Sequence, residues 1–467
     1  MRIHNGYLWY SSVTQVFRQK LTRGKLIPES PMELMLTDTQ PPRSHDTKPI
    51  AFDKKGNMYI PFGAPSDCCQ VSEGAPFSPG KDPCPLLETR GGIWKFDAGK
   101  PNQFQQDGEL FAGGFRSIVA IAWNNADDHL YTIMHGRDYL HWNWPMYYTE
   151  LEGAILPSEE FFRIKKGDNA GWPYAYWDHL KNKKMQAPEY GGNGRMEAKD
   201  SSYLKPIVSF PGHFAPNDLL FYTGNQFPER YRNGAFIAFH GSTSSAPYPQ
   251  AGYFIAFVPF TNGQPSGAWE VFADGFAGRD TIYNTSDAKY RPMGLSQGPD
   301  GSLYVSETEK GKIWRIMFKG VREKFGAPAL AAMDKRKAEA PNTKMPDELK
   351  DNLDRKDYSP AARTYNTYCG KCHERNGEGN NRFPPLKGSE WFAGDIQQPL
   401  HIVLNGMEVE MMVRGRRFIN TMPAFANVLT DEQLADVLTY VKTEFNGAAS
   451  GVSVQEVRKA RKELFKK

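Results

Sequence analysis

Residues 50–62, IAFDKKGNMYIPF, carry the pattern that decides the fold of the larger part of the chain. An apolar pair is followed by a polar turn rich in Asp, Lys and Gly, and then by an aromatic-containing run. Such turns suit tight hairpins, and the flanking alternation suits half-buried strands. The phrase returns in residues 121–133, IAWNNADDHLYTI, and 295–307, LSQGPDGSLYVSE. A hairpin phrase that recurs irregularly every several tens of residues predicts the blades of a β-propeller.

Outward from these hairpins, the chain divides into four parts. Residues 1–320 contain about five blade-like units and are predicted to form an all-β propeller. Residues 321–355 lose the strand formers and are expected to be a linker, partly helical at most. Residues 356–447 are predicted to be a small all-α domain, with Ser359-Pro360 as a helix start and a capping box at 430–433. Residues 448–467 form a basic tail, expected to be a solvated helix, with membrane or partner contact as the alternative.

The composition is that of an ordinary soluble globular protein, with 40% hydrophobic and 24% charged residues. The formal net charge of +4 is too small for this length to indicate nucleic acid binding, and no basic helix is interleaved with aromatic residues. No stretch approaches the roughly 18 apolar residues that a membrane span requires. We therefore expect neither nucleic-acid binding nor a membrane-spanning segment.

Cys369-Gly-Lys-Cys372-His373 is the strongest local signal in the sequence. Two thiols three positions apart can form thioethers to one haem, and the following imidazole then becomes an axial ligand of the iron. A zinc half-site would need a second pair of ligands, and no further Cys follows in this part of the chain. A redox dithiol normally lies in a βαβ setting, which is missing here. We therefore expect covalently bound haem c.

The surrounding residues resemble class I cytochromes c. Phe383-Pro-Pro-Leu386 corresponds to the segment in which a proline carbonyl of that family accepts the other N–H of the ligand imidazole. Asn420-Thr-Met422-Pro-Ala-Phe425 offers a thioether ahead of the last predicted helix. The Met-Pro context favours Met422 as the second axial ligand of the iron. Met407, Met411 and Met412 are the competing methionines, with core packing as their alternative role.

The N-terminal residues and the cysteines point to different compartments. Residues 1–17 lack the apolar core of a signal peptide, which alone would indicate the cytoplasm. Haem attachment of this type resembles chemistry of the exported, oxidising side of a membrane. We therefore expect a periplasmic or otherwise exported protein whose leader and part of whose first blade are missing from this chain. Cys84 could pair with Cys68 or Cys69, leaving one thiol over, and free buried thiols are the alternative.

The propeller region resembles the PQQ-dependent glucose/sorbosone dehydrogenase family, including pyranose dehydrogenase-like enzymes, which is built on a six-bladed propeller. The segments that carry the resemblance occur in family order: FRS at 115–117, HGRD at 135–138, RIKKGDNAGWP at 163–173, HFAP at 213–216, FHGS at 239–242 and YRP at 290–292. The resemblance implies six blades, with part of the first absent here.

The same resemblance implies the site residues. His45, in RSHD at 43–46, matches the base that removes the substrate hydroxyl proton, a role that suits imidazole. Arg116 and Ser117 would contact PQQ near its quinone oxygens, and the family usually has Asn at the second of these positions. Further cofactor contacts are implied for Lys289, Arg291 and His240, and Ca²⁺ would take the backbone carbonyls of Gly136 and Arg137.

Together these features predict a quinohaemoprotein oxidoreductase that oxidises a sugar, a sorbosone-like aldehyde or a polyol at PQQ and passes electrons to haem c. A downstream cytochrome or quinone pool would accept the electrons. Substrate contacts are expected in the insertions at 139–158 and 174–205, where Trp142, Trp144, Tyr147 and Tyr148 could stack on a sugar or form loop core. The alternatives are an electron-carrier cytochrome fused to a non-catalytic propeller and an oxidase without PQQ. The absence of a GxGxxG loop argues against nicotinamide or flavin.

Overall fold

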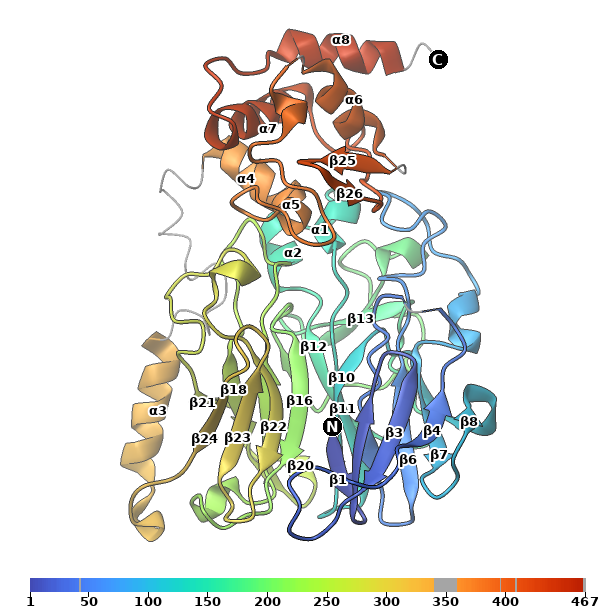
Figure 1. Ribbon diagram of the computed structural model, residues 1–467, viewed down its shortest axis with the longest axis vertical. Helices are drawn as coiled ribbons and strands as arrows, with labels where there is room; N and C mark the ends of the chain where they lie inside the picture. Colours follow the sequence, from blue (N-terminus) through green and yellow to red (C-terminus); the bar gives the residue numbers. More distant parts are fainter. Residues whose placement is uncertain (42, 340–358, 395, 408–409, 465–467) are drawn as a thin grey trace.

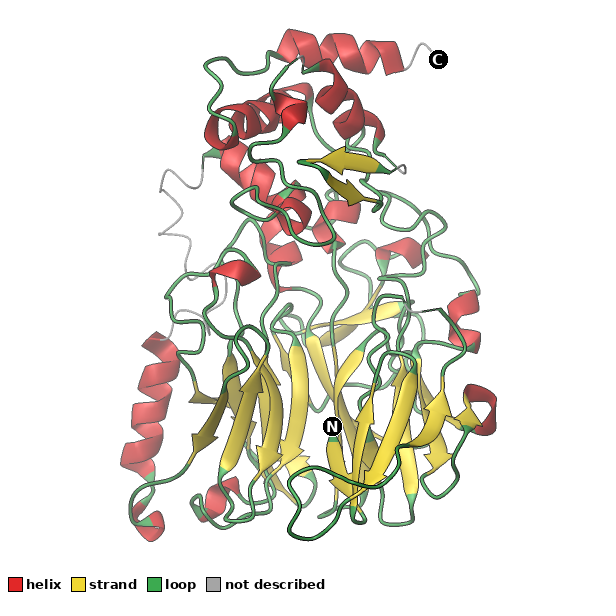
Figure 2. Ribbon diagram, viewed as in Figure 1, coloured by secondary structure: helices red, strands yellow, loops and turns green. Residues whose placement is uncertain are grey.

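The computed structural model describes residues 1–41, 43–339, 359–394, 396–407 and 410–464. A lower part built mainly of strands carries an upper part built mainly of helices (Figures 1 and 2). The two parts correspond to the β-rich and helical regions that the sequence predicts.

Five sheets form the blades of the lower part, and nearly all neighbouring strands are antiparallel. The first contains β1 (Arg2–His4), β2 (Tyr7–Ser11), β3 (Gln15–Lys20) and β4 (Glu33–Thr37), with β8 (Gln103–Phe104) parallel to β4. The second contains β5 (Ala51–Phe52), β6 (Asn57–Phe62), β7 (Gly92–Asp97) and β9 (Glu109–Gly113). The third contains β10 (Ile118–Asn124), β11 (His129–Met134), β12 (Glu159–Ile164) and β15 (Val208–Phe210). The fourth contains β16 (Pro216–Phe221), β17 (Ala235–Phe239), β18 (Phe254–Val258) and β21 (Glu270–Ala273), and the fifth contains β22 (Pro292–Gln297), β23 (Leu303–Glu307) and β24 (Ile313–Ile316).

The hydrophobic core lies between successive sheets. Separate clusters of buried residues join the first sheet to the second, the second to the third, the third to the fourth and the fourth to the fifth. Because the fourth sheet is covered on both faces, every residue of β17 and β18 is buried. This explains why these strands are continuous apolar runs, AFIAF and FIAFV, without polar alternation.

The predicted number of blades is not confirmed. Among the described residues, five sheets of three or more strands form blades, and the first already has four strands of its own in β1 to β4. Its first hairpin turns at Asn5-Gly6, where φ is 48° and 78°, the left-handed values of a tight two-residue turn. This hairpin lacks the apolar pair that marks the recurring phrase, so the phrase alone did not identify it as part of a blade.

Shorter elements decorate the sheets. Insertions supply α1 (Leu140–Asn143), α2 (Glu150–Ile155) and the hairpins β13–β14 (Ala175–Asp178, Lys183–Gln186) and β19–β20 (Phe260–Thr261, Gln264–Pro265). Helix α3 (Ala327–Glu339) lies within the predicted linker and packs along β21. Its Lys337 ammonium lies 3.8 Å from the Trp269 ring centroid and donates to the Trp269 carbonyl at 2.9 Å. Residues 340–358, which include the rest of that linker, lie outside the described residues.

The upper part contains α4 (Pro360–Tyr368), α5 (Gly370–His373), α6 (Gln397–Asn405), α7 (Asp431–Tyr440), α8 (Val454–Leu464) and the hairpin β25–β26 (Met411–Val413, Arg416–Phe418). The predicted helix starts are confirmed, because Ser359 caps α4 and Thr430 forms a capping box with Gln433 at α7. The basic tail is not simply solvated. Val457 and Ala460 of α8 are fully buried, and Arg461 donates to the Leu429 carbonyl at 2.8 Å.

Candidate functional site

The haem-attachment sequence folds as the end of one helix and the start of the next. Cys369 ends α4, and Cys372 and His373 lie on α5, where the His373 amide donates to the Cys369 carbonyl at 2.9 Å. His373 is 7% exposed, and burial lowers the pKa of its imidazole. Its Nδ1 lies 2.8 Å from the Pro384 carbonyl, the orienting contact expected from the sequence. Nε2 therefore remains as the nitrogen that can ligate iron.

Met422 is held by backbone contacts close to the end of α6. Its amide donates to the Met407 carbonyl at 2.8 Å, and the Met407 amide donates to the Met422 carbonyl at 2.9 Å. The turn requires Gly406, which has a φ of 72° and where a Cβ atom would lie 2.6 Å from the Met422 carbonyl oxygen. Met422 packs against the helical core, whereas Met412 on β25 is 50% exposed.

These residues fit haem c. Both Cys369 and Cys372 have free thiols, and burial raises the pKa of each. The remaining donors are the buried imidazole of His373, which the Pro384 carbonyl orients, and the partly buried thioether of Met422.

The second candidate site lies at one end of the propeller, which we call the site face. In an antiparallel sheet, the start of the first strand and the end of the second lie at the same edge. His45, Arg116, His213 and Arg291 precede the first strands β5, β10, β16 and β22. The segments that follow the second strands β6, β11 and β17 begin at residues 63, 135 and 240. The fold therefore gathers distant segments of sequence at one face.

His45 is joined to Arg116 through Ala64. Its Nδ1 lies 2.6 Å from the Ala64 carbonyl, and the Ala64 amide donates to the Arg116 carbonyl at 2.8 Å. Nε2 of His45 has no hydrogen-bond partner within the described ranges. Burial and then the Arg116 guanidinium lower the pKa of His45. The ring is consequently neutral near pH 7, with Nε2 as a proton acceptor.

Arg116 is buried and forms ion pairs with Asp67 and Asp138, the latter at 3.2 Å. On its other side, Asp138 lies 3.3 Å from Nδ1 of His213. Burial would raise the pKa of Asp138, but the His213 hydrogen bond and the Arg116 charge hold it well below its usual range. Nε of Arg116 is buried and has no hydrogen-bond partner among the residues described. The chain Asp67–Arg116–Asp138–His213 therefore joins segments that follow β6 and β11 to segments that precede β10 and β16.

Gly136 connects Arg116 to the buried Glu159. The Gly136 carbonyl accepts from Arg116 at 2.8 Å, and its amide donates to the Glu159 carboxylate at 2.8 Å. Burial raises the pKa of Glu159 to about 7. Arg137 pairs with Glu189 at 2.5 Å. His135 contacts the Pro216 carbonyl at 2.8 Å, and burial lowers the pKa of its ring to about 4.

His240 and Arg291 form a separate pair at the same face. A guanidinium nitrogen of Arg291 lies 2.8 Å from Nδ1 of His240, and the other ring nitrogen lies 2.9 Å from the Thr308 hydroxyl. Burial and then the Arg291 charge lower the pKa of His240 to about 3. Lys289, predicted to act with Arg291, is instead exposed, and its ammonium lies 5.6 Å from the Tyr290 ring centroid. Ser117 is buried, and its carbonyl accepts the His135 amide at 3.0 Å.

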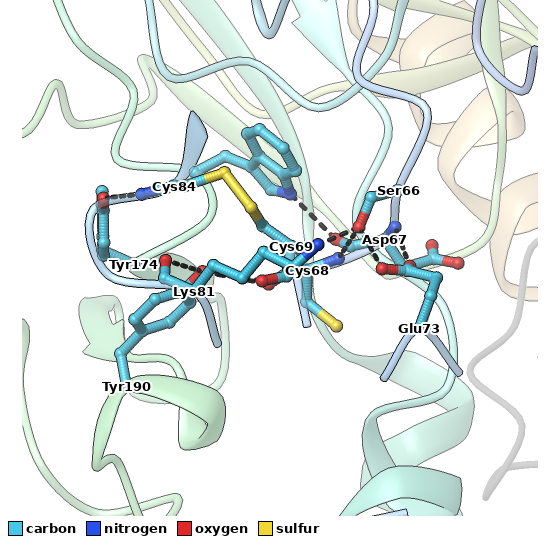
Figure 3. Close-up of a disulfide and its surroundings, with 10 residues drawn as sticks. Ser66, Asp67, Cys68, Cys69, Glu73, Lys81, Cys84, Tyr174 and Tyr190 are labelled. Carbon is cyan, nitrogen blue, oxygen red and sulfur yellow. Dashed lines mark hydrogen bonds between the residues drawn. A yellow bond between two sulfur atoms is a disulfide. The ribbon is translucent and has the colours of Figure 1, made fainter. Parts of the chain in front are cut away.

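A disulfide anchors the loop that presents Asp67. Cys69 pairs with Cys84, which decides between the two pairings left open by the sequence, and Cys68 remains a buried thiol (Figure 3). Ser66 accepts the Cys69 amide at 2.7 Å and donates to Glu73 at 2.7 Å. The Asp67 carbonyl accepts from the Trp172 indole at 2.8 Å. These contacts fix the loop beside Arg116.

Three residues of this cluster were not predicted from the sequence: Asp67, Asp138 and Glu159. Asp138 follows β11 in the quoted HGRD segment, and Asp67 occupies a similar place after β6. The signal shared by Asp67 and Asp138 is a carboxylate a few residues beyond the second strand of a blade, whereas Glu159 is the first residue of β12. The sequence left sugar stacking and loop core as two possible roles for Trp142, whereas in the structure Trp142 packs against the helical domain.

An anionic planar cofactor with several carboxylates fits part of this face. Arg116 has an orphaned donor, Arg291 is a second cation, and His45 has a free nitrogen. The predicted calcium position fits poorly, because the Gly136 carbonyl already accepts from the Arg116 cation. In the described part of the chain, no three His, Cys, Asp or Glu side chains are grouped as a metal site. Likewise, no described helix is both long and apolar enough to cross a bilayer.

Two family models match the chain. Residues 3–319 match the model described as TrAA12-like, and residues 356–441 match the model described as cytochrome c oxidase, cbb3-type, subunit III. Both resemblances stated from the sequence motifs, for the propeller and for the cytochrome, are confirmed by these matches.

Curated relatives match each part separately. A pyrroloquinoline quinone-dependent pyranose dehydrogenase of Coprinopsis cinerea is 26% identical over 251 residues, covering 45% of this chain and 31% of the relative. A gluconate 2-dehydrogenase cytochrome c subunit of Pantoea cypripedii is 33% identical over 113 residues, covering 23% of this chain and 25% of the relative. The chain spans half or less of the length of these relatives.

Solved structures share the propeller fold. The holo form of the pyranose dehydrogenase PQQ domain from Coprinopsis cinerea has a TM-score of 0.52 and 18% identity, covering 67% of this chain and 79% of that one. The calcium structure of the Trichoderma reesei carbohydrate-active enzyme of family AA12 has a TM-score of 0.51 and 18% identity, covering 66% and 77%. At this identity the likeness concerns the fold.

Proposed function

Because this chain belongs to the TrAA12-like family, we propose that it is a quinohaemoprotein oxidoreductase that oxidises a sugar, a sorbosone-like aldehyde or a polyol with PQQ and passes the electrons to haem c. One observation carries the proposal. A neutral His45 with a free Nε2 stands beside the buried Arg116 on the same face of the propeller that faces the haem-attachment helix α5. We take residues 1–320 as the oxidising domain and 356–447 as the cytochrome domain.

In this mechanism His45 is the base. Its Nδ1–H donates to the Ala64 carbonyl, which fixes the tautomer and leaves Nε2 to accept the proton of a substrate hydroxyl or hydrated aldehyde. The lowered pKa keeps the ring neutral, so it is ready to take a proton at pH 7. When bound, PQQ would supply a quinone that accepts the hydride.

The cations of the site face would hold that cofactor. Arg116, aligned by Asp67 and Asp138, would donate to it through its unpartnered Nε, next to Ser117. Arg291, which precedes β22, and His240, which follows β17, would bind its carboxylates. Lys289 is exposed and would have to change its position to join them. We assign no role to Ca²⁺ at Gly136 and Arg137, because the Arg116 guanidinium donates a hydrogen bond to the Gly136 carbonyl.

The cytochrome residues would hold haem c. Thioethers at Cys369 and Cys372 would attach it, and His373 and Met422 would ligate the iron. The haem supplies a one-electron carrier, and thioether ligation raises its potential. The partners are a small sugar or aldehyde substrate and a downstream one-electron acceptor, a cytochrome or the quinone pool. We place the protein in the periplasm or another exported compartment, which the Cys69–Cys84 disulfide supports.

Reconstitution of the haem-loaded full chain tests the proposal. After addition of PQQ, with and without Ca²⁺, aldoses, sorbosone and polyols should reduce the haem, and this reduction is followed by its absorbance. H45Q should slow the reduction by about 10²–10⁴-fold. H129Q, at the start of β11 and therefore at the opposite end of the blade, is the matched control and should retain the wild-type rate. A haem-bearing preparation that binds no PQQ, and whose iron no sugar reduces, would favour the electron-carrier alternative.

A further inference from the structure

The propeller contributes an aromatic side chain to the core of the cytochrome domain. Trp142, on α1, packs against the hydrophobic cluster formed by α4, α6, α7 and α8. Its ring centroid lies 4.6 Å from that of Tyr368 and 5.1 Å from that of Phe425, the second at an edge-to-face angle of 79°. Edge-to-face aromatic contacts of this kind are specific in geometry as well as apolar.

The two partners of Trp142 are adjacent to the segments that hold the haem. Tyr368 immediately precedes Cys369, and Phe425 follows Met422 by three residues. The indole therefore contacts the last residue of α4, next to the attachment motif, and the loop that carries the predicted second axial ligand. A displacement of the cytochrome domain would remove Trp142 from both.

Further contacts between the two domains involve cations and polar groups of the helical domain. The Lys371 ammonium, within the attachment motif, lies 4.8 Å from the ring centroid of Tyr139. Farther along the interface, the Arg375 guanidinium lies 3.9 Å from the ring centroid of Tyr283, and Asn284 donates to the Gly370 carbonyl at 3.4 Å. The propeller residues come from two separate loops, after β11 and before β22, so the contacts resist rotation as well as separation.

We propose that the cytochrome domain occupies one docked position on the site face, anchored by Trp142 and oriented by Lys371 and Arg375, and that it does not merely move on a tether. Figure 1 shows α5 facing the loops of α1 and α2 in this position. The use of this docked state as the route from propeller to haem rests on the proposed function. The docking itself does not. Trp142 is consequently an interdomain anchor, and sugar stacking is left to other residues.

Solution scattering and hydrogen exchange of the full haem-loaded chain test the docking without PQQ or substrate. A docked wild type should have a radius of gyration of about 23 Å, the value for one compact chain of this length. W142A should increase this radius and lower the protection of amides in 139–143 and 365–373 by about tenfold or more. W123A removes another half-buried indole, stacked on Tyr59 at 5.3 Å, and should change neither measurement.

A second variant and a kinetic measurement complete the test. K371E reverses the charge over Tyr139 and should loosen the same amides even if W142A fails to fold. In the PQQ-loaded protein, W142A should slow haem reduction by substrate at least tenfold while turnover with a small dye is kept. An expanded wild type, or equal protection in W142A, K371E and W123A, would overturn the docking. If the PQQ-loaded wild type showed no substrate turnover with the dye, this result would instead count against the proposed function.

Discussion

Removal of the Cys69–Cys84 disulfide should destabilise the propeller by an amount that follows from the loop it closes. The two cysteines are 15 residues apart. In the chain-entropy model, release of a loop of this length gives the unfolded chain about 3 kcal/mol of additional freedom at 25 °C. The variant C69A/C84A should therefore lose about 3 kcal/mol of unfolding free energy.

The expected change in melting temperature is small but measurable. With an unfolding entropy of about 2.1 cal/mol/K per residue, a propeller of roughly 320 residues loses about 4 °C for that free energy. Differential scanning calorimetry of the propeller transition measures it. C68A is the matched control, because it removes a buried thiol of the same loop and leaves the disulfide intact.

The loop also presents Asp67 to Arg116, so the variant should affect the site. A loosened Asp67 frees the Arg116 guanidinium, and the pKa of His45 should then change relative to C68A because both charges act on it. NMR titration of the His45 ring follows this change. A double variant that melts within 1 °C of C68A would refute the entropic stabilisation. So would a thiol reductant that lowers the melting temperature of the wild type by no more than it lowers that of the double variant.

Three further predictions concern single side chains. H45Q should lower kcat/KM for the oxidised substrate by about 10²–10⁴-fold. In a pH–rate profile, the wild-type activity should fall on the acid side below the usual histidine pKa of 6.5, because the pKa of His45 is lowered. A profile without this acid limb would show that another group is the base. M422A should lower the haem midpoint potential by on the order of 0.1 V, part of the roughly 0.8 V that axial ligands span, whereas M412A should not; equal potentials in spectroelectrochemistry would exclude Met422 as a ligand. Glu159 has a folded pKa raised to about 7 from 4.5, so its contribution to stability is complete below pH 4.5 and is lost as the pH rises through 7. Between these limits the wild type should lose about 3 kcal/mol more than E159Q in denaturant unfolding, and parallel curves would contradict the raised pKa.

The cytochrome features were predictable because their information is local. The attachment motif, the proline that orients His373, and the caps at Ser359 and Thr430 each lie within a few residues or a short loop of one another. A local backbone pattern is sufficient to place such groups, whatever the rest of the chain does.

The propeller site was predictable only in part. The family resemblance selected His45 and Arg116, but the pairing of Arg116 with Asp67 and Asp138 depends on how separate blades pack. The choice of Cys69 over its neighbour Cys68 depends on side-chain direction in a loop, where φ of Cys69 is 56°. Neither is encoded in spacing along the chain.

The domain contact through Trp142 was not foreseen, for a related reason. An aromatic residue in an insertion has the same sequence signal whether it covers a ligand, its own loop or another domain. Only the arrangement of Tyr368 and Phe425 around the indole distinguishes these cases.

The gathering of the first-strand starts at one face has a consequence for how such a protein can diversify. Each blade supplies its own short segment to the rim, and some of these segments also supply core residues such as Phe115 and Phe214. A substitution in one segment that spares those core residues acts first on its own sector of the opening, and it reaches the next sector through ion pairs such as Arg116–Asp67. Ligand preferences can therefore shift by changes in neighbouring sectors while the sheets beneath keep their packing.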